Sequence, residues 1–167
     1  PTYGVRLLQA SEYQTSITNG QTTLDNIKLA NASGVASNVT LASATTVNSL
    51  SLNVSALTSP ITLDGATLKL HSGSLFAQSV NPATAGAEMT INNTLDLNGG
   101  QGVIFYNTVN SSNGTGGAKL FLNGNLSNDG GNGVVISGAG VVEFSGTTAN
   151  TYTCLLYTSP SPRDATL

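Results

Sequence analysis

The segment Ile61-Thr-Leu-Asp-Gly-Ala-Thr-Leu-Lys-Leu70 places an apolar residue at every second position on both sides of an Asp-Gly pair. Alternation over so few residues is typical of very short strands with one buried face. The Asp64-Gly65 pair is compatible with a hairpin turn. It is equally compatible with a corner between two strands of one coil, because glycine reaches positive φ without strain. The segment therefore predicts two short strands that meet at a sharp turn.

The same short alternation recurs along the chain. Two bulky apolar residues flank one polar residue at five places: Leu50 and Leu52, Leu68 and Leu70, Leu95 and Leu97, Leu120 and Leu122, and Val142 and Phe144. The first members of successive pairs are 18, 27, 25 and 22 residues apart. Recurrence every ~20–30 residues is typical of a solenoid, whose repeats bury their apolar faces against one another. The spacing predicts a right-handed parallel β-helix of about five to six coils.

Small and turn-forming residues stand where these strands end, as at Asn98-Gly99-Gly100 and Asn123-Gly124-Asn125. Asn and Gly tolerate the left-handed backbone that a sharp corner needs. Stacked coils would place Asn side chains above one another, where their amides form hydrogen-bonded ladders. A meander of hairpins would instead have strands of about 5–6 residues joined by two-residue turns. A β-sandwich built from such hairpins is the alternative fold.

Composition supports an ordered, single-domain, all-β chain. Gly, Ser, Thr and Asn occupy 78 of the 167 positions, while 39% of residues are apolar and only 8% are charged. The apolar content and low charge argue against disorder. The net charge is −3 and the five Lys and Arg residues are dispersed, which excludes the cation cluster that nucleic-acid binding requires. No apolar run approaches the ~20 residues of a membrane-spanning helix, so we expect no membrane insertion within this chain.

The pattern divides the chain into three parts. Residues 1–23 lack the repeat and are expected to form an N-terminal cap or an irregular first coil, with a turn or short helix near Ala10–Tyr13. Residues 24–153 are expected to form the β-helix. The chain begins at Pro1 without Met or a signal peptide, so we expect it to be an internal piece of a longer protein.

The stretch Gly138-Ala-Gly-Val-Val-Glu-Phe-Ser-Gly-Thr-Thr-Ala-Asn-Thr-Tyr-Thr153 resembles the autotransporter-associated β-strand repeat. That family's pattern is Gly-x-Gly, an alternating apolar strand, Ser-Gly and then Asn-Thr-Tyr-Thr-Gly. The matched positions are Gly138, Gly140, Val142, Phe144, Ser145, Gly146, Asn150, Thr151, Tyr152 and Thr153. Upstream, residues 46–52 and 61–70 resemble the coils that precede such repeats, so the resemblance covers residues 35–153. It implies a secreted or surface-displayed bacterial passenger β-helix that adjoins further repeats of one long parent chain.

The sequence departs from the family pattern at Cys154, where the family has Gly. Residues 154–167 contain the only cysteine, two of the five prolines and neither Gly nor Asn. This segment resembles translated adaptor read-through at the end of an environmental sequence assembly. We therefore predict that residues 154–167 are a non-native or disordered tail, and the alternative is an ordinary proline-containing linker. A single cysteine also excludes an internal disulfide framework and a thiolate metal site.

Residues suited to catalysis or metal binding are dispersed. Glycoside hydrolysis needs two carboxylates about 5–10 Å apart, but the acidic residues stand singly. Asp64 and Asp96 each follow Thr-Leu and are expected on one face of neighbouring coils, with Lys69 nearby. His71 is the only histidine and is interpreted as a surface residue. Gly99–Gly102 and residues 130–133 begin like calcium repeats but lack the ligand Asp, so both are interpreted as turns.

The sequence therefore predicts a structural or adhesive, non-catalytic segment of a large extracellular or outer-membrane-surface bacterial protein, with no cofactor and no metal. Two alternatives stay open. One is a carbohydrate-active β-helix enzyme, a polysaccharide lyase or hydrolase. The other is a glycan-binding module in which polar rows with Phe105 and Tyr106 bind sugars by stacking and hydrogen bonds. Cell-surface or matrix glycans or proteins are the expected partners, and nucleic acid is not.

Overall fold

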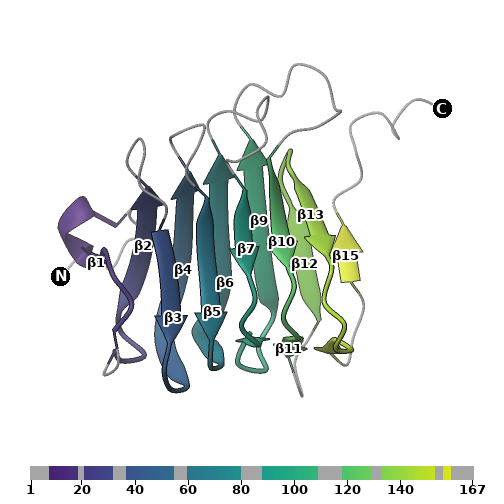
Figure 1. Cartoon of the computed structure of the whole chain (residues 1–167), viewed down its shortest axis with the longest axis horizontal. Coiled ribbons are helices and arrows are strands. Elements are labelled where there is room, and N and C mark those ends of the chain that lie inside the picture. The colour runs from purple at the N-terminus through teal and green to yellow at the C-terminus, as the bar shows by residue number, and fades with distance from the viewer. Residues whose placement is uncertain are drawn as a thin grey trace, which may run out of the picture.

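A computed structural model of the chain shows a parallel β-solenoid (Figure 1). It describes residues 8–18, 21–31, 37–54, 60–79, 88–108, 118–128, 133–152 and 156–158; of Ser37 and residues 156–158 it describes only the backbone. Every strand pairing in the described part of the chain is parallel. The predicted fold class is confirmed, and the β-sandwich alternative, which requires antiparallel hairpins, is excluded for these residues.

Two sheets form the walls of the solenoid. The ten-stranded sheet contains β1 (Tyr13–Gln14), β2 (Asn26–Asn31), β4 (Thr45–Val54), β6 (Leu68–Ser79), β8 (Leu95–Asp96), β9 (Gly102–Thr108), β11 (Leu126–Asn128), β12 (Val134–Ser137), β14 (Thr151–Tyr152) and β15 (Leu156–Thr158). The five-stranded sheet contains β3 (Ser37–Leu41), β5 (Ile61–Gly65), β7 (Met89–Ile91), β10 (Lys119–Leu122) and β13 (Val141–Phe144). A 3-10 helix, η1 (Ala10–Glu12), precedes β1.

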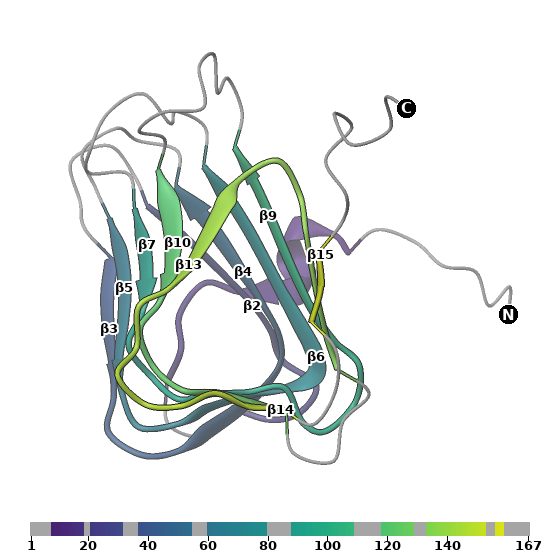
Figure 2. The ribbon, with the colours of Figure 1, turned by 90° about the vertical axis from the view of Figure 1, so that its right-hand side faces the viewer.

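Each coil follows the same path. Seen from the C-terminal side, the chain runs up the wall formed by β4, β6 and β9 and down the wall formed by β5, β7 and β10 (Figure 2). The ten-stranded sheet bends, so that its short strands β8, β11 and β14, together with the first residues of β4 and β6, form the floor between these walls (Figure 2). In β4 the pairing register with β6 shifts between Val47 and Ser49, and at the same level of β6 Gly73 has a φ of +68°. The winding is right-handed, as predicted.

The structure has about four turns rather than the predicted five to six. The difference arises because the five apolar pairs do not all occupy the same position in a coil. Leu68 pairs with Leu95, and Leu120 with Val142, as the spacing predicts. Leu50, however, pairs with Leu75 instead of Leu68.

The spacing also predicts that Leu120 lies over Leu95 in the next coil, and this prediction is wrong. Leu95 pairs with Leu126, 31 residues further along, and Leu120 lies over Met89 on the opposite wall. One coil therefore contributes apolar residues to both sheets. Counting each apolar pair as one coil overestimates the number of turns.

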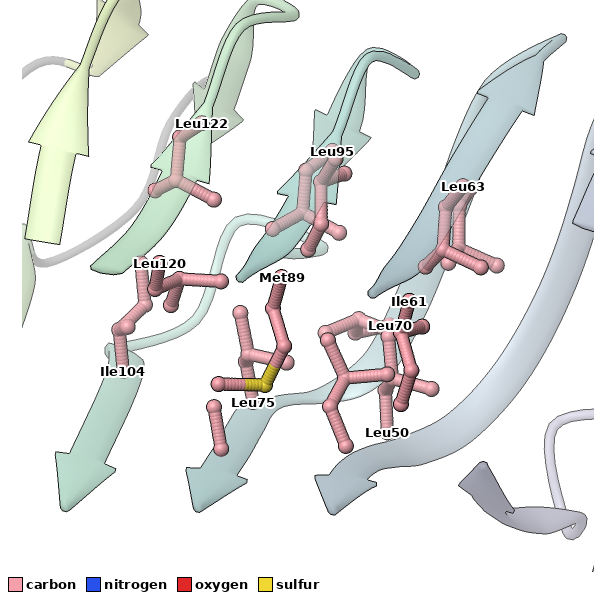
Figure 3. Close-up of a cluster of buried hydrophobic side chains, with 14 of the residues drawn as sticks. Leu50, Ile61, Leu63, Leu70, Leu75, Met89, Leu95, Ile104, Leu120 and Leu122 are labelled. Carbon is pink, nitrogen blue, oxygen red and sulfur yellow. The ribbon is translucent and has the colours of Figure 1, made fainter. Parts of the chain in front are cut away.

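The interior is a continuous apolar column. Side chains from both sheets point toward one another along its length (Figure 3). The largest fully buried ones are Tyr106, Ile27, Leu50, Leu52, Ile61, Leu63, Leu68, Leu70, Leu75, Met89, Ile91 and Leu95. Burial of one Leu or Ile side chain contributes about 1.5–3 kcal/mol. Each coil covers only one cross-section of the column. Its apolar side chains are therefore buried only when neighbouring coils stack against it.

The predicted corners are present. Gly65 has a φ of +95° at the corner between β5 and β6, so Asp64-Gly65 is a coil corner rather than a hairpin turn. A Cβ at Gly65 would lie 2.3 Å from the carbonyl oxygen of Leu41 in the preceding coil. Asn98 and Gly99 have φ angles of 62° and 70°. The coils turn sharply there because these two residue types accept a left-handed backbone.

At the N-terminal side, η1 leads into β1, which pairs in parallel with β2. At the C-terminal side, the Asn150 side chain connects two coils, because its Oδ1 accepts a 2.8 Å hydrogen bond from the Leu126 amide. Of the segment 154–167, including Cys154, most lies outside the described residues. The backbone of Leu156–Thr158 pairs in parallel with β12. The origin of this segment stays a prediction.

Candidate functional site

The acidic residues singled out in the sequence lie on different walls. Asp64 is the penultimate residue of β5 in the five-stranded sheet, whereas Asp96 lies in β8 of the ten-stranded sheet. The expectation that both occupy one face is wrong, because the Gly65 corner separates them. Lys69 pairs with Asp96, with 3.4 Å between Nζ and Oδ2, as a neighbour on the adjacent coil. Within the described part of the chain, no three His, Cys, Asp or Glu residues cluster as a metal site would require.

Asp64 is instead the first residue of a ladder of hydrogen-bonded polar side chains that extends over three coils. Asn92 Nδ2 donates a 2.5 Å hydrogen bond to Asp64 Oδ1, and Asn123 Nδ2 donates a 3.0 Å bond to Asn92 Oδ1. Asp64 lies near the end of β5, and Asn92 and Asn123 directly follow β7 and β10, so the ladder stabilises one corner of successive coils. The predicted Asn ladder is confirmed here. Its hydrogen bonds give Asp64 a structural role.

His71 is exposed on β6, as predicted. Asn98 Nδ2 donates a 2.8 Å hydrogen bond to the His71 carbonyl oxygen and lies 3.3 Å from its Nδ1 atom. The histidine is thus tied to the adjacent coil at the Asn98 corner.

Tyr106 is not a surface ring, and its expected contact with sugars is wrong. It is completely buried, and its hydroxyl donates a 2.5 Å hydrogen bond to the Ala118 carbonyl oxygen. Burial raises the pKa of the Tyr106 hydroxyl well above its ordinary value, and the negative charge of Glu88 adds to this. The cause is the period of two in β9, which points Tyr106 inward and Phe105 outward.

Phe105 is outward and has an aromatic partner on the next coil. Its ring stacks on that of Phe76 with a centroid distance of 5.3 Å and an interplanar angle of 6°. The two residues are register partners on β9 and β6, and Phe76 is 42% exposed. The stack therefore runs along the solenoid axis, with each ring plane facing the neighbouring coil.

The positions of Phe105 and Phe76 belong to a row of register partners, which continues across the outer face of the ten-stranded sheet. Phe76 is paired with Ser51 of β4, and Ser51 with Lys28 of β2. Because Ser51 is small, the row dips between the Phe76 ring and the Lys28 side chain. Lys28 Nζ lies 5.9 Å from the centroid of the Tyr13 ring, which holds the lysine at this edge by a cation–π contact.

This dip is part of a groove of about 530 Å³, a volume typical of small-molecule sites. Its lining comes from the five neighbouring strands β1, β2, β4, β6 and β9: Tyr13, Lys28, Ser49, Leu50, Ser51, Asn53, Ser74, Leu75, Phe76, Gln78, Val103 and Phe105. Lys28 is the only charged residue among the described residues that line the groove. We call this surface the β4 groove, and it is the candidate binding site.

The opposite wall carries a different polar contact. Lys119 Nζ donates a 2.8 Å hydrogen bond to Glu143 Oε2, across β10 and β13. This bond lowers the pKa of Glu143, with a further contribution from the Ser145 hydroxyl, and raises the pKa of Lys119. Both side chains are about 40% exposed, so the pair joins two coils at the surface.

Sequence reasoning missed Phe76, Lys28 and Tyr13 as members of one site. Alternation within each strand indicates that Phe76 and Lys28 face outward, since each lies between inward apolar residues. Their proximity follows only from register across three coils. Residues 28, 51 and 76 are separated by 23 and 25 positions, whereas the apolar pairs in the same strands begin at Leu50 and Leu68, only 18 positions apart.

Comparison of the chain with protein-family models, with curated proteins and with solved structures gives no match. In the described ranges, no helix has the length and apolar character needed to cross a membrane.

Proposed function

We propose that this chain is a structural and adhesive segment of a large secreted or surface-displayed bacterial protein. The observation that carries the proposal is the unbroken parallel ladder in both walls. One sheet continues from β1 to β14 and the other from β3 to β13, with each strand paired to the next coil. Such a stack is extended by adding coils, and its backbone hydrogen bonds are already satisfied.

Contacts between coils support a mechanical role. Polar ladders, apolar columns and backbone bonds all run along the axis, as in the Asp64–Asn92–Asn123 ladder. The last described coil supports the expectation that further repeats adjoin this segment. Val142 and Phe144 occupy the rows of the buried Leu120 and Leu122, yet Phe144 is 36% exposed. Another coil would cover this apolar side chain.

An adhesive role is supported by the β4 groove, in which aromatic, hydroxyl and amide side chains are combined. These groups suit a sugar, because apolar ring faces stack on aromatics while hydroxyls form hydrogen bonds. A glycan-binding module is therefore a second candidate that is compatible with the first. In the first candidate function the chain serves mainly as a structural spacer, and in the second it serves mainly to bind glycans.

The proposal is tested by incubating the purified chain with immobilised acidic and neutral polysaccharides. We expect retention on at least one of them, no release of reducing ends or unsaturated sugars, and resistance of the coils to proteinase K. Depolymerisation would overturn the proposal in favour of the enzyme alternative. Rapid proteolysis throughout the coils would contradict a structural role.

A further inference from the structure

We propose that the β4 groove binds an acidic oligosaccharide, with one uronic acid ring seated over Ser51 between Phe76 and Lys28. This deepens the adhesive part of the proposed function by assigning it a site and a ligand class. The inference depends on the row of paired residues that crosses the ten-stranded sheet on its outer face.

The row is an aromatic stack with one position vacant. Phe105 and Phe76 occupy successive coils, and their parallel rings are 5.3 Å apart. The next coil has Ser51 at the paired position, where a third ring would stand. Adjacent strands lie about 4.8 Å apart. A flat ring above Ser51 therefore lies at stacking distance from the free face of Phe76.

The other side of the vacant position carries a positive charge. Lys28 is paired with Ser51 one coil further and is held near Tyr13. It lies about two strand spacings, or roughly 10 Å, from the Phe76 position, which is enough for one ring of ordinary thickness. A carboxylate on the edge of that ring reaches the ammonium group.

Charge complementarity selects an anion. The chain has a net charge of −3, yet the part of the groove lining that the structure describes contains Lys28 and no Asp or Glu. An ammonium group beside a partly enclosed, apolar wall strengthens a charge-assisted hydrogen bond to a carboxylate. A neutral ligand would supply no opposite charge to this cation.

The floor and sides of the groove select a sugar over an aromatic side chain. Ser49, Ser51, Ser74, Asn53 and Gln78 supply hydroxyl and amide groups around the vacant position. A pyranose ring has an apolar C–H face for Phe76 and equatorial hydroxyls for these groups. A uronic acid adds the carboxylate that Lys28 requires.

The test measures binding of tri- to hexagalacturonate to the full chain by calorimetry, with methyl-esterified oligomers of the same length for comparison. The methyl ester retains the ring and removes the charge. We expect the acid form to bind about tenfold more tightly than the ester at low salt, and the difference to shrink in 0.5 M NaCl as the charges are screened.

Two variants separate charge from shape. Lys28→Gln is expected to weaken binding of the acid form about tenfold and to leave ester binding unchanged. Ser51→Phe fills the vacant position with a third ring of the stack, so it is expected to abolish binding of both forms. Because Ser51 points outward, this variant is expected to fold, which its thermal transition checks.

Matched controls lie outside the groove. Lys69→Gln removes a lysine that is paired with Asp96, and Thr90→Phe places a ring beside Phe121, its register partner on the five-stranded sheet. Both are expected to bind like the unmodified chain. Equal loss of binding in Ser51→Phe and Thr90→Phe would overturn the assignment of the binding site to the β4 groove.

Equal affinity for the acid and ester forms would overturn the role of Lys28 and the acidic ligand. Failure of the unmodified chain to bind any galacturonate oligomer would overturn the inference as a whole. The proposed structural function would survive these results, because it is contradicted by proteolysis of the coils and not by loss of this ligand.

Discussion

Gly140 lies directly against the ring of Tyr106. A Cβ at Gly140 would come within 2.2 Å of the Tyr106 Cδ1 atom. Gly138, two residues earlier, has a φ of +113°, and a Cβ there would come equally close to the Tyr106 carbonyl oxygen. The Gly-x-Gly pair therefore lets the last turn before β13 pass over a buried aromatic residue of the preceding coil.

Gly140→Ala is expected to lower the free energy of unfolding by about 1–3 kcal/mol, because the added methyl group overpacks the core against the Tyr106 ring. Gly100→Ala is the matched control, since a Cβ there meets no atom within 4 Å. Urea unfolding followed by circular dichroism measures both. Equal stability of the two variants would show that the Tyr106 ring shifts at no cost.

Asn92→Asp is expected to destabilise the chain in a pH-dependent manner. It replaces the amide that donates to Asp64 with a second carboxylate, so at neutral pH the ladder contains two like charges. Protonation of either carboxylate removes the repulsion. The melting temperature of the variant should therefore approach that of the unmodified chain as the pH falls from 7 to 3.

Asn38→Ala, at an exposed position of β3, is the control for that experiment. Its effect is expected to stay within about 0.5 kcal/mol at every pH. A deficit of Asn92→Asp that is the same at pH 3 and pH 7 would contradict charge repulsion at Asp64.

Glu143 is expected to contribute stability at neutral pH and to lose that contribution in acid. Its pKa is lowered in the folded chain from 4.5, mainly by the hydrogen bond from Lys119. The unfolded state then takes up a proton first as the pH falls through 4.5, and stability declines until the folded carboxylate is protonated as well.

Glu143→Gln should therefore melt below the unmodified chain at pH 7, and the difference should vanish below the lowered pKa. Differential scanning calorimetry across pH 2–7 measures this convergence. Curves that stay parallel would mean that the Lys119 contact contributes nothing through charge.

Leu120→Ala is expected to lower the free energy of unfolding by about 2–5 kcal/mol, because Leu120 is fully buried and its removal leaves a cavity between coils. Leu24→Ala is the control, since Leu24 is 82% exposed and should change stability by less than about 0.5 kcal/mol. Chemical denaturation compares the two. Equal effects would contradict a shared apolar column.

Burial within short strands was largely predictable. Alternation placed Leu95 and Leu120 inside, and both are buried. Thr94, which directly precedes Leu95, is half-buried, and its carbonyl oxygen accepts a hydrogen bond from the Leu68 amide. A residue between strands has no alternation to follow, so its exposure depends on the neighbouring coil.

The candidate site was much less predictable. The sequence pointed to Phe105 and Tyr106 as a pair, but adjacent residues of a strand face opposite sides of the sheet. The aromatic partner of Phe105 is Phe76, which lies 29 residues away. The number of residues per coil varies along the chain, so the contact between Phe105 and Phe76 cannot be deduced from their separation in the sequence.

The sequence by itself determined that the chain forms short parallel strands with sharp Asn and Gly corners around an apolar interior. That information is local, because a period of two and a tolerance for left-handed backbone belong to single strands and single residues. Only the tertiary structure decided which strands stack and therefore which outward side chains meet. Register between coils is set by cooperative packing of the whole column, and it alone brings Lys28, Ser51 and Phe76 into one row.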